Sequence, residues 1–230
     1  MLPLDAEAID SIFLSLRLSA TVTGLLILLG TPLAWWLVRT RSPLKGMVEA
    51  FVVLPLFLPP TVLGFYMLLA MGPKGPIGAL TQALGLHGLP FTFSGLVVTS
   101  MLYSLPFVVQ PLQNSFAGIE PRLLEAAQSL RAGPWASFGR IVLPLSKRGF
   151  LTAAVTGFAH TIGEFGVVLM VGGNIPGETR LVSIEIYDYV EAFDYPKAHT
   201  LAGMMVAFAF FMLLLLYGFG VGRDGLLRRS

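Results

Sequence analysis

The feature that most limits how this chain can fold is a series of five long apolar segments separated by short polar stretches. They cover about residues 12–38, 47–71, 92–113, 149–172 and 199–221. An α-helix of roughly 20 apolar residues crosses a bilayer core about 30 Å thick, so each segment is long enough to span a membrane. Only 12% of the residues are charged, whereas soluble domains carry about 25%. The sequence therefore predicts an all-α, polytopic membrane protein with about five transmembrane helices in a single domain over residues 1–230.

The lysines and arginines of the short loops predict which way the chain is inserted. Eleven of them lie on one side of the predicted spans: Arg39, Arg41, Lys45, Arg122, Arg131, Arg140, Lys147, Arg148, Arg223, Arg228 and Arg229. The other side carries Lys74, Arg180 and Lys197. Because positively charged loops stay in the cytoplasm, we expect the N-terminus outside the cell and the C-terminus in the cytoplasm.

Several absences narrow the possible functions. The chain has no cysteine, which excludes disulfides, thiolate metal sites and cysteine nucleophiles. It has no Gly-x-x-x-x-Gly-Lys-Ser/Thr motif, so it lacks the phosphate-binding loop of an ATPase. The formal net charge of +2 is too small to indicate nucleic-acid binding. We therefore expect a chain that is not an enzyme and that holds no metal or cofactor of its own.

A polar, helix-compatible stretch with an excess of Lys and Arg runs from Ile119 to Arg148, between two apolar segments. Pro121 suits the first turn of a helix, and Glu120 lies near the positive N-terminal end. The following Gly133-Pro134 pair is a helix stop, so a helix is predicted over residues 120–132. Such a helix is suited to receive a mechanical push from a soluble partner, or simply to tie two spans together.

A motif in this stretch resembles the EAA loop of permease subunits in bacterial ABC importers. It consists of Glu125, Ala126, Ala127, Ile141, Leu143 and Pro144. In that family the loop, here residues 117–148, forms a coupling helix that docks in a groove of the ATPase subunit. The family pattern has a glycine where this chain has Arg131, and we expect Gly133 to take over the helix stop. The Ile-x-Leu-Pro spacing and the membrane context favour the coupling interpretation over a plain loop helix.

Prolines interrupt several of the predicted spans. They are Pro32, Pro55, Pro59, Pro60 and Pro106. Such breaks are tolerated where neighbouring helices or a water-filled path satisfy the freed carbonyls. The strongest distortion is the run from residue 55 to 64, Pro-Leu-Phe-Leu-Pro-Pro-Thr-Val-Leu-Gly. It is predicted either to be a packing kink or to form a gate that lines a path, with Pro59, Pro60 and Gly64 as the gate residues.

The fourth span contains two ionisable side chains, His160 and Glu164, on one face of the predicted helix. Ionisable groups within a span are costly and are candidates for function. One histidine and one glutamate do not make a metal site, so for His160 we favour a His–Glu contact or helix–helix hydrogen bonding within the bundle. For Glu164 we favour a role at a gate or a subunit interface. Gly163 and Gly166 permit close helix approach on either side of it, and together with Phe165 they complete the candidate gate residues of this span.

The loop between the last two spans is acidic, and its middle, residues 181–193, alternates apolar and polar residues in part. A lone strand there would have no partner, so we expect an amphipathic helix on the outer face. The loop is interpreted either as a docking surface for a substrate-binding protein or as a solvated loop. The docking candidates are Asn174, Pro176, Gly177, Glu178, Thr179 and Arg180.

Residues 30–35, 55–64, 163–166 and 173–180 resemble the permease of molybdate-type ABC importers, a resemblance that extends over nearly the whole chain. It implies a homodimer in the bacterial cytoplasmic membrane with two ATP-binding cassette subunits, which bind the ATP and Mg. It also implies a periplasmic or extracellular oxyanion-binding protein that delivers molybdate or tungstate. Sulfate permeases are similar, so sulfate is the alternative cargo. Because an ionised Glu164 in the path would repel a dianion, we expect it to be paired, protonated or beside the path.

Two other classes of membrane protein fit the sequence less well. A secondary transporter or channel acting alone more often shows matched broken helices in two inverted halves, and the sequence indicates no matching pair. A membrane scaffold without transport activity has no need for a docking helix together with proline-broken spans.

Overall fold

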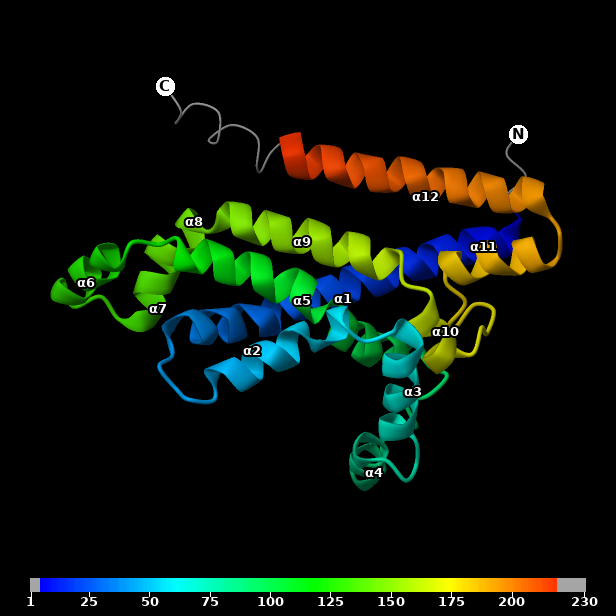
Figure 1. Cartoon of the computed structure of the whole chain (residues 1–230), viewed down its shortest axis with the longest axis horizontal. Coiled ribbons are helices and arrows are strands. Elements are labelled where there is room, and N and C mark those ends of the chain that lie inside the picture. The colour runs from blue at the N-terminus through cyan, green and yellow to red at the C-terminus, as the bar shows by residue number, and fades with distance from the viewer. Residues whose placement is uncertain (1–4, 219–230) are drawn as a thin grey trace.

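The computed structural model describes residues 5–218, which form helices and no strand (Figure 1). The long helices α1 (Ala6–Arg39), α5 (Phe93–Ala117) and α9 (Lys147–Ile162) pack side by side along the longest dimension of the molecule. The helix α12 (Tyr195–Leu216) runs along the outside of this bundle and leaves most of its surface uncovered. The prediction of an all-α chain is confirmed.

The bundle core consists of aliphatic side chains that recur at helical spacing on α1 and meet those of α5. Leu18, Val22 and Leu26 of α1 are buried, as are Val108 and Leu112 of α5. Glycine brings α9 close to α5, since a Cβ on Gly157 would lie 2.6 Å from Cγ2 of Val108. Small residues of this kind allow helix backbones to approach closely in a membrane.

Among the described residues, three helices are long and apolar enough to cross a membrane alone, namely α1, α5 and α12. Two further spans are broken rather than straight. The pair Lys45–Leu56 and Pro60–Ala83 bends by 114°, and the pair Lys147–Ile162 and Gly166–Gly172 bends by 61°. The total is five only if each bent pair counts as one span. The first bend lies within the run 55–64, where the strongest distortion was predicted, whereas the bend in the span 149–172 was not predicted.

The first break separates α2 (Lys45–Val53) and the 3₁₀ turn η1 (Leu54–Leu56) from α3 (Pro60–Met71). Pro59 has extended backbone angles, φ −55° and ψ 136°. Proline has no N–H to donate, and it disfavours helical geometry in the residue before it. Two consecutive prolines therefore end one helix and start the next in a new direction.

The second halves of the two broken spans pack against one another. These are α3 and α10 (Gly166–Gly172). A Cβ on Gly64 would lie 2.8 Å from Cβ of Met170, and one on Gly166 would lie 3.2 Å from Cβ of Pro60. The two broken spans thus meet in the structure, although the sequence indicates no matching pair. One break is made by prolines and the other follows Gly163, so the two share no sequence pattern.

The predicted coupling segment forms a cluster of short helices at one end of the bundle (Figure 1). These are α6 (Pro121–Ser129), α7 (Pro134–Ser137), the π-helical turn η2 (Phe138–Val142) and α8 (Leu143–Leu145). The helix α6 ends earlier than the predicted residue 132. Arg131 takes the left-handed conformation, with φ 58°, and the amide of Ala132 donates to the carbonyl of Ala127 at 2.9 Å.

This reversal is the Schellman ending of a helix, in which the left-handed residue is usually glycine. The expectation that Gly133 replaces the missing glycine was wrong, because Gly133 has φ −67° and precedes α7. Arg131 itself adopts the conformation that a glycine at this position would favour.

Arg131→Val is expected to weaken the end of α6 by about 1–2 kcal/mol, because a β-branched residue is strained at positive φ. Arg131→Gly is expected to keep the helix end or strengthen it, since glycine enters this region without steric cost. Amide hydrogen exchange at Leu130 and Ala132 measures both effects. The control is Arg122→Val, an exposed position within the same helix. Equal exchange in the two valine variants would contradict the assigned helix ending.

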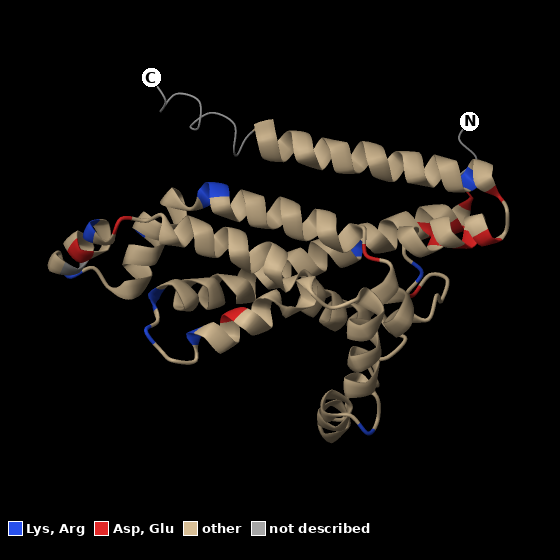
Figure 2. Cartoon of the chain, viewed as in Figure 1, with Lys and Arg blue, Asp and Glu red and all other residues tan. Residues whose placement is uncertain are grey.

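The segment 181–193 contains the helix α11 (Val182–Glu191), which confirms the helical interpretation over a strand. It packs against α1 and α12 at the end of the bundle opposite α6. Acidic residues gather at this end, whereas Lys and Arg predominate around the loops at the α6 end (Figure 2). The helix α12 starts at Tyr195, four residues before the predicted span. The last part of that span, residues 219–221, and the basic residues Arg223, Arg228 and Arg229 lie outside the described residues.

Candidate functional site

Glu164 lies at the break between α9 and α10 and is only 3% exposed. Two hydroxyl groups from α5 bind its carboxylate. Ser100 Oγ donates to Oε2 at 2.5 Å, and Ser104 Oγ donates to Oε1 at 2.8 Å. A buried carboxylate is stabilised by charge-assisted hydrogen bonds of this kind. The expectation that Glu164 is paired is confirmed.

His160 completes the network on the same side of α5. Its Nδ1 lies 2.9 Å from Ser104 Oγ and 3.6 Å from Oε1 of Glu164. Ser104 Oγ also lies 2.9 Å from Oγ1 of Thr161, so this one hydroxyl contacts the side chains of His160, Thr161 and Glu164. The imidazole stacks on Phe107 with ring centroids 3.8 Å apart. The predicted helix–helix hydrogen bond of His160 is thus confirmed.

The network involves only one acidic side chain. Within residues 5–218 there is no group of three or more His, Cys, Asp or Glu side chains that could hold a metal ion.

The structure brings most of the predicted gate residues into one region. Pro60 and Gly64 lie on α3 against α10, which begins at Gly166. Phe165 lies at the break and contacts Tyr187 of α11, with ring centroids 5.2 Å apart. The carbonyl of Glu164 accepts a hydrogen bond from Ser183 Oγ at 2.5 Å. The break in the fourth span is therefore held by both α5 and α11, with Gly163 as the C-cap of α9.

Sequence reasoning missed the serines that bind Glu164. Ser100 and Ser104 are four residues apart and so share one face of α5, as do His160 and Glu164 on the fourth span. The same four-residue spacing of polar side chains in two apolar segments was the signal that could have indicated a contact between the two helices.

The outer loop from residue 173 to 180 is tied together by its own side chains. Arg180 Nε donates to Oδ1 of Asn174 at 2.8 Å, and its guanidinium lies 3.2 Å from Glu7 and 3.5 Å from Glu185. Thr179 is fully buried and donates to the carbonyl of Gly172 at 2.7 Å. Of the six docking candidates, three lie on the open surface: Pro176, Gly177 and Glu178. Thr179 supports the loop from inside and has no surface to offer a partner in this conformation.

Charged side chains also join the start of α1 to α11 and α12. Asp5 accepts hydrogen bonds from Lys197 Nζ at 3.0 Å, from the amide of Ala8 at 3.0 Å and from Tyr189 at 2.8 Å. These donors, Lys197 foremost, lower the pKa of Asp5 to about 2. Burial raises the pKa of Glu185, an effect that Arg180 partly offsets. Asp5 was not among the predicted functional residues.

The coupling candidates lie mostly on the surface of the cluster that contains α6. Glu125 and Ala126 are exposed, while Leu124 and Ala127 face the bundle and are buried. Exposed positions also include Arg131, Gly133, Leu143 and Pro144, and Ile141 is half-buried. Leu130 and Trp135 are 84% and 88% exposed, which leaves a large apolar surface beside α6 uncovered.

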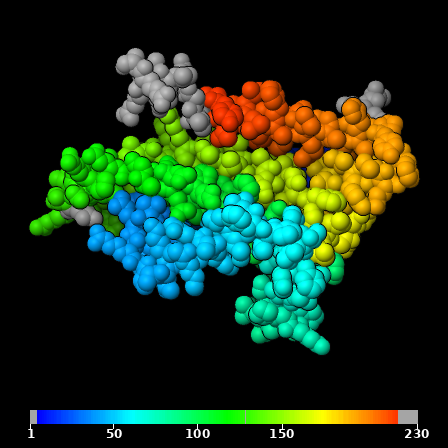
Figure 3. Space-filling model, viewed as in Figure 1, coloured from blue at the N-terminus to red at the C-terminus, as the bar shows by residue number. Residues whose placement is uncertain are grey.

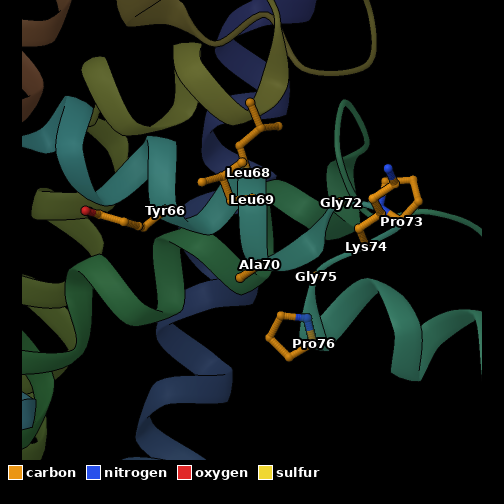
Figure 4. A pocket seen from close by; sticks show the side chains of 9 residues that line it. All are labelled: Tyr66, Leu68, Leu69, Ala70, Gly72, Pro73, Lys74, Gly75 and Pro76. Carbon is orange, nitrogen blue, oxygen red and sulfur yellow. The ribbon is translucent and has the colours of Figure 1, made fainter.

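A cavity of about 690 Å³ lies at the turn from α3 to α4 (Pro76–Ala83), lined by residues 66, 68–70 and 72–76 (Figure 4). Its walls are apolar apart from Tyr66 and Lys74 and include none of the gate candidates. The α3–α4 arm that carries it projects from the body of the molecule (Figure 3).

A sequence profile of the family described as "Binding-protein-dependent transport system inner membrane component" matches residues 26–229. The chain belongs to this family. Among curated relatives of this inner membrane component, the "Molybdenum transport system permease protein ModB" of Azotobacter vinelandii is 62% identical over 216 residues, 94% of this chain and 96% of the relative. The protein of the same name from Escherichia coli K12 is 35% identical over 184 residues, 79% of this chain and 80% of the relative. The "Probable sulfate transport system permease protein cysT" of Zygnema circumcarinatum is 33% identical over 226 residues, 98% and 77% of the two chains.

Solved structures with the same fold come from ABC transporters. A chain of the bacterial alginate ABC transporter in complex with its alginate pentasaccharide-bound periplasmic protein superposes with a TM-score of 0.73 at 19% identity. That match covers 94% of this chain and 78% of the other. A chain of the inward-facing MetNI methionine ABC transporter superposes with a TM-score of 0.69 at 18% identity, over 90% and 92% of the two chains. This inner membrane component is thus a multi-pass membrane protein with an ABC transporter permease fold.

Proposed function

We propose that this chain is the permease subunit of an ABC importer that moves molybdate or tungstate across the cytoplasmic membrane, driven by ATP hydrolysis in a separate subunit. The observation that carries the proposal is its 62% identity with ModB of Azotobacter vinelandii over nearly the full length of both proteins. The identity with the sulfate permease of Zygnema circumcarinatum is 33%, which makes sulfate the second candidate cargo.

The proposed complex contains a second copy of this chain, two ATP-binding cassette subunits that bind ATP and Mg, and an external oxyanion-binding protein. Membership of a binding-protein-dependent transport family supports the ATPase and the binding protein. The proposed insertion places the α6 end in the cytoplasm and the α11 end outside. The segregation of basic and acidic side chains to these two ends supports that orientation.

The helix α6 is the proposed docking element for the ATPase. It is exposed on the face that carries Glu125 and Ala126, and its other face packs on the bundle through Leu124 and Ala127. A displacement of α6 is therefore transmitted to the spans that it joins. The ATPase biases inward-open against outward-open states through its different contact energy with each state.

The proposed gate is the packed pair α3 and α10, with Glu164 beside the path rather than in it. The two serine hydroxyls occupy the carboxylate, so its charge is directed into the bundle. A dianion needs hydrogen-bond donors along its route more than a fixed cation that would trap it. The glycine contacts between α3 and α10 allow these two half-helices to move as one body.

Reconstitution tests the proposed function. Proteoliposomes that contain this chain, its ATP-binding subunit and the binding protein are expected to accumulate molybdate only when ATP is supplied. Tungstate should compete at equal concentration, and sulfate should not. Equal competition by sulfate would favour the sulfate-type permease, whereas ion flux through this chain without an ATPase would indicate a transporter that acts alone.

A further inference from the structure

An apolar cavity of about 600 Å³ lies between α1 and the helices that follow α6, beside the contact between the Trp35 and Phe138 rings, whose centroids are 5.8 Å apart. Leu28, Pro32 and Trp35 of α1 form one wall, and Trp135, Phe138 and Phe150 form the other. Cavities of this size and apolar lining are typical sites for small apolar ligands. Leu28 is 69% exposed, so the cavity opens to the surface of the bundle.

A second cavity of about 320 Å³ adjoins the first and is more polar. The two share Trp35, Pro134 and Phe138 in their walls. The second cavity adds Arg39, whose guanidinium lies 4.7 Å from the centre of the Trp35 ring. It also adds Ser137, whose buried Oγ has no hydrogen-bond partner among residues 5–218.

We call the two adjoining cavities, whose shared wall includes the Trp35–Phe138 ring contact, the amphipathic groove. Its cationic end is Arg39, the last residue of α1, and its apolar part reaches back to Ile27. The helix rises about 18 Å from residue 27 to residue 39, which is on the order of the length of a lipid acyl chain. No acidic residue lines either cavity.

We propose that this groove binds an anionic phospholipid, with an acyl chain between α1 and η2 and the phosphate near Arg39 and Ser137. The cation at one end and the apolar lining at the other match the headgroup and the acyl chain of an anionic lipid. The protein lies in a lipid bilayer, so such lipids surround it. Juxtamembrane arginines attract anionic lipid headgroups. The site is independent of which cargo the transporter carries.

Other occupants fit the groove less well. A free anion would pair with Arg39 but would leave the apolar cavity empty. Residues 219–230 carry Arg223, Arg228 and Arg229, whose positive charge opposes that of Arg39.

The position of the groove gives the lipid a consequence for the protein. One wall belongs to the long helix α1. The other belongs to α7, η2 and the start of α9, which connect α6 to the helix bundle. A lipid in the groove therefore bridges the coupling segment and α1.

Tryptophan fluorescence tests the proposal directly, because Trp35 lines both cavities and the chain has 3 tryptophans. The Trp36→Phe, Trp135→Phe double variant leaves Trp35 as the only reporter. This full-length chain is placed in phosphatidylcholine nanodiscs that contain a minor fraction of lipid with brominated acyl chains, which quench tryptophan on contact. The brominated lipid is either phosphatidylglycerol or phosphatidylcholine.

Brominated phosphatidylglycerol is expected to occupy the groove about fivefold more readily than brominated phosphatidylcholine, the preference expected from one arginine at a membrane surface. Arg39→Gln should remove the preference, and Arg41→Gln, which lines neither cavity, should keep it. Leu28→Phe should reduce quenching by both lipids, whereas Val206→Phe on α12 should not. Thermal unfolding of each variant in nanodiscs verifies that it is folded.

Equal quenching of Trp35 by the two brominated lipids would overturn the proposal, since it would indicate ordinary contact with bulk lipid. Loss of the preference on addition of inorganic phosphate would also overturn it in favour of a free anion. Unchanged quenching in Leu28→Phe would exclude an acyl chain from the apolar cavity. As an independent readout, native mass spectrometry of the wild-type chain should retain phosphatidylglycerol, and Arg39→Gln should lose it.

Discussion

Ala126→Trp is expected to lower ATP-driven uptake strongly while the chain still folds and inserts. Ala126 is exposed on α6, on the face turned away from the buried residues Leu124 and Ala127. A substitution at an exposed position changes stability little. An indole placed in a fitted interface costs about 1–3 kcal/mol, which is roughly 5- to 150-fold in docking affinity. Uptake by reconstituted vesicles should therefore fall at least about fivefold.

Two measurements separate lost docking from misfolding. Co-purification of the ATP-binding subunit with the Ala126→Trp chain should fall together with uptake, and the thermal unfolding temperature of the chain should stay near that of the wild type. The matched control is Ala207→Trp, an exposed alanine on α12, which should leave both uptake and co-purification unchanged. Normal uptake by Ala126→Trp would mean that α6 does not carry the coupling.

Glu164→Ala is expected to lower the free energy of unfolding by about 2–4 kcal/mol, because Ser100 and Ser104 lose the acceptor of their buried hydroxyl groups. Each serine can turn its hydroxyl back to a helix carbonyl, which limits the loss. Thermal unfolding of the detergent-purified chain measures the change. Glu49→Ala is the control, since Glu49 is 41% exposed and lies 3.8 Å from Lys45. Exposed pairs of this kind contribute only about 0–1 kcal/mol.

Glu164→Gln separates the structural role of this residue from a role in transport. The amide keeps one acceptor oxygen and nearly the same volume, and a serine hydroxyl accepts as well as donates. We therefore expect the Gln variant to assemble with the ATP-binding subunit and to unfold within about 1–2 kcal/mol of the wild type. A fall in uptake by assembled Gln variant would support a role at the gate. Unchanged uptake would leave Glu164 with a packing role alone.

The local pattern of the sequence was sufficient for the helical class and for the positions of the apolar segments. A run of apolar residues between polar loops has only one stable form in a bilayer, because every backbone group must find its partner within its own helix. The segment 120–132 was recognised as a helix from Pro121 and the Gly133-Pro134 pair, and α6 covers Pro121–Ser129. The end of α6 was misplaced, because the sequence does not reveal that Arg131 would adopt a positive φ.

In the site around Glu164, the sequence likewise indicated some residues and left their partners to the tertiary structure. The polarity and the spacing of His160 and Glu164 in the fourth span indicated a pair of functional interest. The partners of that pair could not be read locally, since Ser100 lies 64 residues and Ser104 lies 60 residues earlier in the chain. The pairing of α3 with α10 was equally hidden, because prolines make one break and a glycine marks the other.

What the sequence determined by itself was the helical class, the apolar segments, the proline-made break after residue 55 and which loops carry positive charge. Those properties depend on the hydropathy and backbone chemistry of neighbouring residues. The tertiary structure decided which broken helices meet, which hydroxyl groups bind Glu164 and which loop residues are covered, as Thr179 is. Contacts between distant segments depend on how whole helices pack, and that packing is set by the shapes of many side chains at once.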